Sequence, residues 1–291
     1  YILFTLTLFW LNFIFSQGYE PITLEDVNDL ETYSKDGYGF ANQIPVRASL
    51  EKFVPVIGNQ GKTGSCVAWA TTYYNLSIAY NSIFNITNEA EKFMHSFDPW
   101  FTFTQLNSSN NCMGSVHPIK AMEFIRDYGA KKLMFPPYDL ECNESISQNT
   151  FNIMKRYLAP YKIDKFESLW AKDLDPWKYP MSNETVSSIK TEIGKYGLPV
   201  AAGFRNYDGS LDKVGSSGYW YPTYKAKSGG HFMTIVGYDD YVNGGSFRVV
   251  NNWGEDWGDN GFAWIRYSDF KKFCDIALFT WVSGNINRSF A

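Results

Sequence analysis

The chain has 291 residues, a formal net charge of −4 and 45 % hydrophobic residues. This composition supplies enough apolar surface for a sizeable core and excludes an intrinsically disordered chain. Lys and Arg form no run, so we expect no nucleic-acid partner. The sequence also has no metal-ligand spacing and no phosphate-binding loop, so we expect no metal and no cofactor. The length suits one large domain or two lobes that share a core.

Residues 1–17 form an uncharged and almost wholly apolar segment. It is shorter than the roughly 20 residues that a membrane-spanning helix needs. It fits the apolar part of a signal peptide that is cut near Ser16 or Gln17, although the chain has no initiator Met. A buried strand or a membrane anchor is the alternative. We therefore expect a secreted or periplasmic protein with no stable membrane partner beyond this segment.

A polar leader over residues 18–44 is predicted to precede the folded domain. A glycine-rich loop then leads into residues 66–84, which contain no Gly or Pro and have the length of a helix. Ser65 stands at the N-cap position, so Cys66 is expected to open this helix.

The remaining pattern predicts an α+β fold within a domain over residues 45–291. Helices are predicted within 117–130 and over 185–196, where apolar residues recur at helical spacing and Gly follows. The last third contains short β-branched and aromatic segments separated by Gly, Asn and Asp turns, which predicts an antiparallel sheet or barrel. We expect a helical lobe at about 50–165 and a β-rich lobe at about 166–285.

Three separate windows carry residues suited to nucleophilic catalysis. Cys66 follows a glycine-rich approach at the start of a helix, where unpaired N–H groups favour a thiolate. Gln60 precedes it and offers a side-chain amide as a second donor to an oxyanion. The alternative for Cys66 is a small buried hydrophobe, which is the usual fate of a cysteine outside a disulfide.

The second and third windows offer a base and a group to orient it. His231 opens an apolar strand after two glycines, a setting that holds an imidazole rigidly but leaves one side open. Asn251 can accept a hydrogen bond from the ring and fix its tautomer, and Trp253 can cover that bond. A buried structural histidine and an ordinary β-turn are the respective alternatives.

Together these windows resemble the papain family of cysteine peptidases. The residues occur in the family's order: Gln60 six positions before Cys66, then His231, then an Asn-x-Trp-Gly-x-x-Trp-Gly-x-x-Gly motif that begins at Asn251. The resemblance extends over about residues 45–282, and the segment around His231 is most similar to the bacterial branch. It implies a two-lobed fold with the active site in the cleft between the nucleophile-bearing helical lobe and the β-rich lobe that carries His and Asn.

The resemblance implies a cysteine-type peptidase that hydrolyses protein or peptide substrates through an acyl-enzyme. Cys66 would attack as half of a thiolate–imidazolium pair with His231, and Asn251 would orient the imidazole. Gln60 and the Cys66 N–H would form the oxyanion hole.

The same resemblance implies five residues around the substrate. Gly114 and Ser115 would bind its main chain, Trp253 would shield the His–Asn pair, and Trp257 would lie on the leaving-group side. Phe232 is larger than the usual residue after the catalytic histidine, so the pocket for the side chain two residues before the attacked carbonyl is expected to be narrowed or shifted.

The chain departs from the family pattern in its cysteines. Thr63 occupies a position that is usually Cys, so one family disulfide is absent. From family counterparts we expect Cys112 and Cys142 to pair in an oxidising compartment. Cys274 is expected to be a buried core residue. The leader is also shorter than the inhibitory propeptide of many relatives; either no propeptide controls activity or the leader does so in shortened form.

A different class of function uses the same fold. The chain could be a catalytically weak papain-like domain that binds peptide or glycan at a surface, which its 18 % aromatic content would suit. Retention of Gln60, Cys66, His231 and Asn251 favours the enzyme. Acyl transfer in place of hydrolysis would use the same residues.

Overall fold

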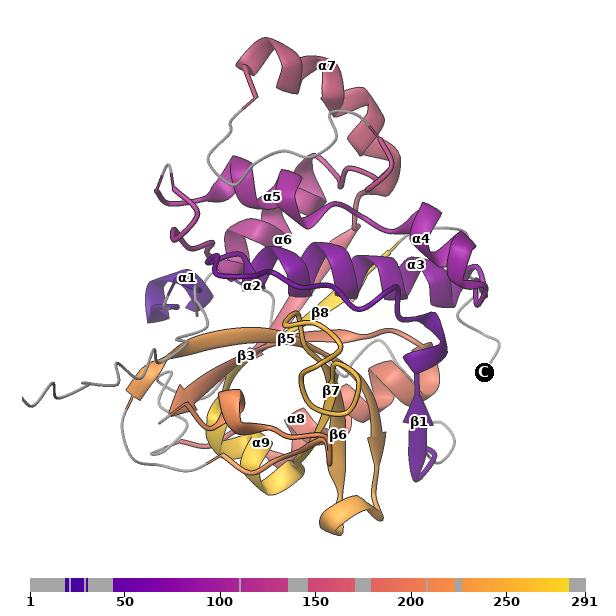
Figure 1. Ribbon diagram of the computed structural model, residues 1–291, viewed down its shortest axis with the longest axis vertical. Helices are drawn as coiled ribbons and strands as arrows, with labels where there is room; N and C mark the ends of the chain where they lie inside the picture. The colour runs from indigo at the N-terminus through magenta and orange to yellow at the C-terminus, as the bar shows by residue number, and fades with distance from the viewer. Residues whose placement is uncertain are drawn as a thin grey trace, which may run out of the picture.

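The computed structural model describes most of the predicted domain and part of the leader. The described residues are 19–20, 22–28, 30, 44–109, 111–135, 146–170, 179–207, 209–222 and 227–282. The predicted signal peptide, most of the leader and Cys142 lie outside them. Figure 1 shows helices α2 to α7 gathered on one side of a curved sheet, with the helical segment that begins at Cys66 nearest to the sheet.

Cys66 opens a continuous helical segment, as predicted. The segment comprises α2 (Cys66–Ala68), η3 (Trp69–Leu76) and α3 (Ser77–Ile83). Its middle part has π-helical geometry. Such geometry is rare in proteins, and where it occurs it is often at a functional site. Every residue of η3 is buried, so this helix is an interior element between the sheet and the outer helices.

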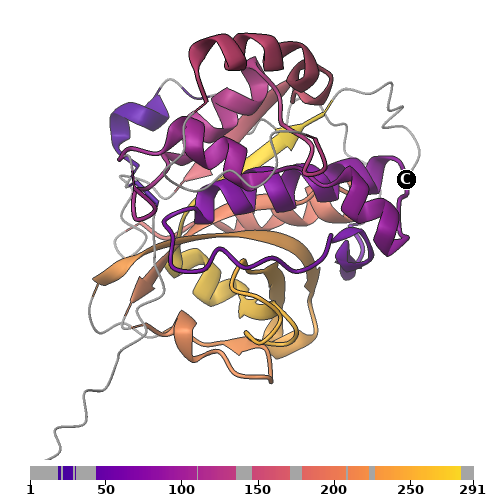
Figure 2. The same ribbon diagram turned by 45° about the horizontal axis from the view of Figure 1, so that its top comes forward.

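Four further helices lie on the side of the central one that faces away from the sheet (Figure 2). They are α4 (Glu89–His95), α5 (Pro99–Leu106), α6 (Pro118–Asp127) and α7 (Gln148–Leu158). Side chains of Asn88, Asp98 and Ser147 accept hydrogen bonds from the first-turn N–H groups of α4, α5 and α7 respectively. These caps satisfy donors that a helix cannot pair internally, which fixes where each helix begins.

Eight strands form one sheet in the order β2-β8-β3-β5-β6-β7-β4, and β1 also pairs with β5. Their bounds are β1 (Arg47–Ser49), β2 (Lys165–Trp170), β3 (Val200–Tyr207), β4 (Tyr219–Trp220), β5 (Lys227–Asp239), β6 (Ser246–Val250), β7 (Phe262–Arg266) and β8 (Cys274–Trp281). The pairs are antiparallel, as predicted, except that the short β4 runs parallel to β7. The long β5 lies between β3 and β6, so neighbours on both sides fix its register.

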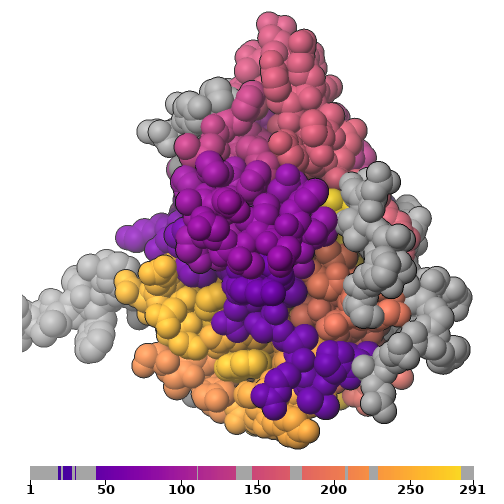
Figure 3. Space-filling model, turned by 90° about the vertical axis from the view of Figure 1, so that its right-hand side faces the viewer, coloured from indigo at the N-terminus to yellow at the C-terminus, as the bar shows by residue number. Residues whose placement is uncertain are grey.

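Two helices, α8 (Asn183–Thr191) and α9 (Tyr267–Phe273), pack on the sheet, and α8 continues as η6 (Glu192–Tyr196). Gly197 ends η6 with φ +66°, a left-handed conformation that glycine adopts without a Cβ clash. The helix predicted over 185–196 is therefore confirmed. The chain from residue 44 to about 60 crosses the face where the helical part meets the sheet (Figure 3).

Two features of the structure differ from local expectation. Ser65 takes the N-cap position, but its side chain makes no cap bond, because its hydroxyl lies 2.7 Å from that of Thr63. The leader contains a short helix, α1 (Leu24–Asn28), which the sequence analysis did not predict. Thr23 and Asp26 bond to each other across its first turn, a local arrangement that nucleates a helix.

A buried ion pair joins α5 to the segment after α6. Lys131 is 1 % exposed, and its Nζ lies 2.8 Å from Oδ2 of Asp98, the residue that also caps α5. A buried charge that loses its partner is costly, whereas an exposed pair contributes little. The pair therefore holds α5 close to the segment after α6, and removal of either charge should be strongly destabilising.

We expect Asp98→Asn, which keeps the cap oxygen but removes the charge, to lower the free energy of unfolding by about 3 kcal/mol. Asp127→Ala, which breaks the exposed pair with Arg126, should change it by less than about 1 kcal/mol. Urea unfolding of both variants in a Cys66→Ala background measures the difference. Equal effects of the two substitutions would show that the buried pair is energetically ordinary.

Candidate active site

Cys66 lies at the inner end of a loop that packs tightly against a second loop. The Gly64 N–H donates to the Cys112 carbonyl at 3.0 Å. A Cβ at Gly64 would lie 1.8 Å from the Gly114 carbonyl oxygen, so only glycine allows this approach. Cys66 is 0 % exposed and begins the helix, where N–H groups and the macrodipole favour negative charge on sulfur.

Gln60 belongs to the same loop and is 1 % exposed. Its side-chain amide donates to the Thr63 carbonyl at 2.6 Å, and its backbone N–H donates to the Asn252 carbonyl at 2.8 Å. The loop is thus tied to the segment that carries Asn251. The donor group expected for an oxyanion is present near Cys66 and bonded within its own loop.

His231 lies on β5 opposite Phe204 of β3 and is 0 % exposed. Its Nε2 lies 2.7 Å from Oδ1 of Asn251, so the predicted contact is present. Nδ1 has no hydrogen-bond partner in the part of the chain that the structure describes. The Trp253 ring lies 4.4 Å from the imidazole at 40°, which places it over the pair.

Burial determines the charge of this histidine. It lowers the His231 pKa to about 4, and the hydrogen bond to Asn251 opposes that shift. The imidazole is therefore neutral at pH 7 in this structure. If Nε2 carries the hydrogen and donates to Asn251, Nδ1 presents the lone pair that a base requires.

The helix and the sheet meet at hydrogen bonds between side chains and backbone. Asn252 Nδ2 donates to the Cys66 carbonyl at 3.3 Å and to the Phe232 carbonyl at 3.2 Å. Thr234 Oγ1 donates to the Ala70 carbonyl at 2.9 Å. These bonds link the window that carries Cys66 to the window that carries His231. The sequence pattern did not indicate this linking role of Asn252, because the family motif assigns a role only to the adjacent Asn251.

The residues expected around a substrate differ in accessibility. Gly114 and Ser115 lie beside the Cys66 loop, with the Ser115 carbonyl accepting from the Ser108 N–H at 3.0 Å. Phe232 is 0 % exposed, and a Cβ at Gly203 would lie 2.7 Å from its ring. Trp257 is 6 % exposed and donates its indole N–H to the Leu211 carbonyl, so it presents little surface here. Their roles remain predictions.

A leader residue that the sequence analysis did not single out lies against this site. Tyr19 bridges to Val116, directly after Ser115, and its ring lies 5.4 Å from that of Phe232. Its hydroxyl makes a short hydrogen bond to Asp275. A Cβ at Gly230 would lie 1.8 Å from the Tyr19 ring, so the glycine before His231 leaves room for it. No periodicity could have indicated this contact, since it joins distant parts of the chain.

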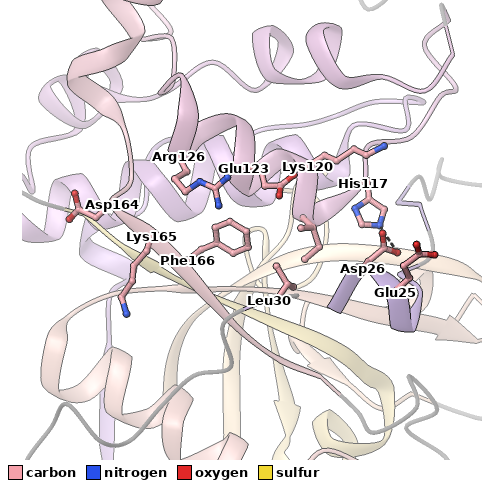
Figure 4. Close-up of a pocket in the computed structure, with 11 residues that line it drawn as sticks. Glu25, Asp26, Leu30, His117, Lys120, Glu123, Arg126, Asp164, Lys165 and Phe166 are labelled. Carbon is pink, nitrogen blue, oxygen red and sulfur yellow. Dashed lines mark ion pairs between the residues drawn. The ribbon is translucent and has the colours of Figure 1, made fainter. Parts of the chain in front are cut away.

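A cavity of about 530 Å³ lies between α1 and the surface formed by α6 and β2 (Figure 4). His117 and Asp26 point toward each other at its edge, with Nε2 and Oδ2 3.3 Å apart. Among the described residues, its charged lining consists of Glu25, Asp26, Glu123, Asp164, Lys120, Arg126 and Lys165. The mixed signs give the cavity no strong preference for an anion or a cation. None of the predicted site residues lines it.

The remaining cysteines are only partly covered by the structure. Cys274 is buried as expected; its thiol bonds to the Ile276 carbonyl, and burial raises its pKa. Cys142 lies outside the described residues, so the Cys112–Cys142 disulfide stays a prediction. Within the described ranges, no group of three or more His, Cys, Asp or Glu is placed to hold a metal ion. No helix in those ranges is both long and apolar enough to cross a membrane.

Comparison with known proteins identifies the family. A family model described as papain family cysteine protease matches residues 41–282, and the chain belongs to that family. It is 24 % identical over 224 residues to cathepsin B-like cysteine proteinase 3 of Caenorhabditis elegans, covering 73 % of this chain and 57 % of that protein. It is 32 % identical over 130 residues to cathepsin B-like cysteine proteinase 3 of Ostertagia ostertagi, covering 43 % and 67 %.

Solved structures support the same fold. Xylellain, a cysteine protease from Xylella fastidiosa, aligns with a TM-score of 0.65 at 18 % identity over 92 % of this chain and 97 % of that one. Digestive procathepsin L2 from Tenebrio molitor aligns with a TM-score of 0.64 at 20 % identity, over 92 % and 79 %. The predicted two-lobed papain-like α+β fold is therefore confirmed, and the expected similarity to bacterial members has a counterpart in xylellain.

The buried imidazole gives a direct prediction. In the Cys66→Ala chain we expect His231 to titrate near pH 4 by NMR, and Asn251→Ala should lower that pKa further, because the hydrogen bond raises it. A pKa depressed below 6.5 means that the unfolded state binds the proton first, so stability is full above about pH 6.5 and falls toward pH 4. His231→Gln assigns the resonance and should flatten that slope. Titration near 6.5 would contradict the burial.

Proposed function

We propose that this chain is a cysteine-type peptidase with Cys66 as nucleophile and His231 as its base. The observation that carries the proposal is the 2.7 Å contact between His231 Nε2 and Asn251 Oδ1. It orients the ring so that Nδ1 is the nitrogen available for the thiol proton. Membership in the papain family supports a peptide substrate.

In the proposed reaction Nδ1 takes the thiol proton and the Cys66 thiolate attacks the peptide carbonyl carbon. The oxyanion accepts hydrogen bonds from the Cys66 N–H and from the Gln60 amide, which exchanges its Thr63 partner for this role. His231 protonates the departing amine as the C–N bond breaks. Water, deprotonated by His231, then attacks the thioester and releases the acid. An amine in place of water would give transfer, which product analysis distinguishes.

The catalytic assignment is tested with an epoxysuccinyl thiol-reactive probe and a peptide substrate on the chain freed of its leader. Cys66→Ala should abolish both labelling and turnover. Gln60→Ala should lower kcat by about 10²-fold or more, because one oxyanion donor is removed. Cys274→Ala, which removes the other buried thiol, should leave labelling intact. Labelling that persists in Cys66→Ala would contradict the assignment, and a substrate bound without turnover would favour the binding function.

We also propose that the leader over residues 18–44 holds the site closed, as a short pro-segment of the domain over 45–291. Val27 is 0 % exposed in the apolar cluster that contains Cys66, so α1 docks on the domain. Tyr19 lies beside Val116 on one side and Gly230 on the other. An extended substrate that contacts Gly114 and Ser115 would need this space.

The charge state of the site agrees with closure. Cys66 and His231 are both 0 % exposed, and burial holds the imidazole neutral. Admitting water would remove the desolvation that lowers the His231 pKa. The imidazolium partner of the thiolate would then be stabilised, so departure of the leader would both admit substrate and permit the ion pair.

The leader proposal predicts that Tyr19→Ala increases probe labelling of the uncleaved chain. Full burial of such a side chain contributes roughly 1.5–3 kcal/mol, and Tyr19 is partly buried, so its loss should enlarge the open fraction by at most roughly 10- to 100-fold. Tyr19→Phe, which removes only the bond to Asp275, should give a smaller increase. Tyr241→Ala, at a tyrosine that is 71 % exposed, is the matched control. Unchanged labelling in Tyr19→Ala would show that Tyr19 does not hold the leader.

Substrate recognition and location complete the proposal. We propose an extended protein or peptide substrate that pairs with Gly114 and Ser115, with Phe232 narrowing the neighbouring pocket. Secretion and the Cys112–Cys142 disulfide belong together, because such bonds persist in oxidising compartments. Cys112 lies in the described loop beside Gly64, and its proposed partner Cys142 lies outside the described residues.

A further inference from the structure

Asn252 contacts the backbone or side chain of three of the four predicted catalytic residues. Its backbone N–H donates to Asn251 Oδ1 at 2.8 Å, and its carbonyl accepts from the Gln60 N–H at 2.8 Å. Its side-chain amide donates to the carbonyls of Cys66 and Phe232, at 3.3 and 3.2 Å. Phe232 follows His231 directly, so the fourth residue is one peptide unit away.

The orientation of this amide follows from its partners. Cys66 and Phe232 both present carbonyl oxygens, which accept hydrogen bonds and cannot donate them. Only the NH₂ group of Asn252 can satisfy both, so Nδ2 must face them and Oδ1 must point away. One nitrogen thus sits between the first helical residue and the strand beside His231.

Burial of the Asn252 amide costs free energy that an apolar side chain at this position would not cost. Asn252 is 0 % exposed, and its Oδ1 has no hydrogen-bond partner among the described residues. A buried acceptor left unsatisfied costs about 1–3 kcal/mol. An apolar side chain of the same size would avoid that cost but would leave two buried carbonyls unlinked. The polar residue therefore secures a geometric relation between the helix and the strand.

Asn252 also acts on the orienting group. Oδ1 of Asn251 accepts from two donors, the Asn252 N–H at 2.8 Å and His231 Nε2 at 2.7 Å. The first bond fixes the amide so that its oxygen, and not its nitrogen, faces the imidazole. Rotation of the 251–252 peptide would alter both the His231 orientation and the helix–strand separation.

We propose that Asn252 is a positioning residue that sets the approach of the Cys66 thiol to His231. The inference rests on the proposed peptidase function. Displacement of reacting groups by about 1 Å can cost about 10²-fold in rate, so a side chain that holds both carbonyls has leverage on kcat without touching substrate.

The test compares Asn252→Leu with Asn81→Leu in the chain freed of its leader. Asn81 lies on α3 of the same helical segment, is also 0 % exposed, and donates its amide to the Phe53 carbonyl at 3.0 Å. Both substitutions remove a buried amide of the same size, but only one amide reaches the site. The measurements are kcat, KM, the midpoint of urea unfolding, and the pH dependence of Cys66 alkylation by iodoacetamide.

We expect Asn252→Leu to lower kcat roughly 10- to 100-fold with a KM change below about threefold. Its alkylation profile should shift toward the value of about 8.5 of an ordinary thiol, because the thiolate loses its imidazolium partner. Asn252→Ser, which keeps one donor and little volume, should lie between wild type and Asn252→Leu and decides the matter if the leucine variant does not fold. Asn81→Leu should lose stability with an unchanged profile.

The proposal is overturned if Asn252→Leu or Asn252→Ser loses stability as Asn81→Leu does but keeps the wild-type kcat and alkylation profile. Asn252 would then be a structural residue only. The proposed peptidase function is tested independently of Asn252. Turnover by the wild-type chain that is lost in Cys66→Ala establishes that function, whatever the Asn252 variants do.

Discussion

The site depends on buried polar groups that meet where the central helix packs on the sheet. His231, Asn251 and Asn252 are each 0 % exposed, so their hydrogen bonds cannot be exchanged for bonds to solvent. Each amide must therefore keep a fixed direction, and the imidazole inherits that direction through Asn251. A wetter seam would tolerate rotation of these groups and would lose the relation between the thiol and its base.

The sheet makes this arrangement rigid. His231 lies on β5, which is hydrogen-bonded to β3 on one side and to β6 on the other. Asn251 follows β6 directly, and its N–H donates to the Gly261 carbonyl at 2.9 Å. His231 and Asn251, the proposed base and its orienting group, are thus placed by the register of neighbouring strands, since a one-residue slip would turn every side chain to the opposite face.

The sequence predicted those features that depend on local residue patterns or on the family motif. The helix that opens at Cys66, the strand at His231 and the Asn251 contact follow from composition, turn residues and the order of three windows. Asn252 and Tyr19 could not be predicted in the same way, because their partners lie far away in the chain: Cys66 for Asn252, and Asp275 for Tyr19. The π-helical turn of η3 also escaped prediction, since its residues have no pattern that separates it from an α-helix.

Burial of Cys66 and His231 opposes formation of a thiolate–imidazolium pair. The proposed leader role would let burial come first and the ion pair form later. Under the proposed leader role, the closed chain gains from burying Val27 and part of Tyr19, while burial keeps the His231 imidazole neutral. The positions of Cys66 and His231, which we propose are set by the sheet and by Asn252, do not require the ion pair to exist. If the leader closes the site as proposed, the geometry is built during folding, when an exposed thiolate would be a hazard, and the charges form after the leader departs. On this view the hydrogen bonds of Asn252 are needed most in the open enzyme, where the contacts of Tyr19 and Val27 are lost.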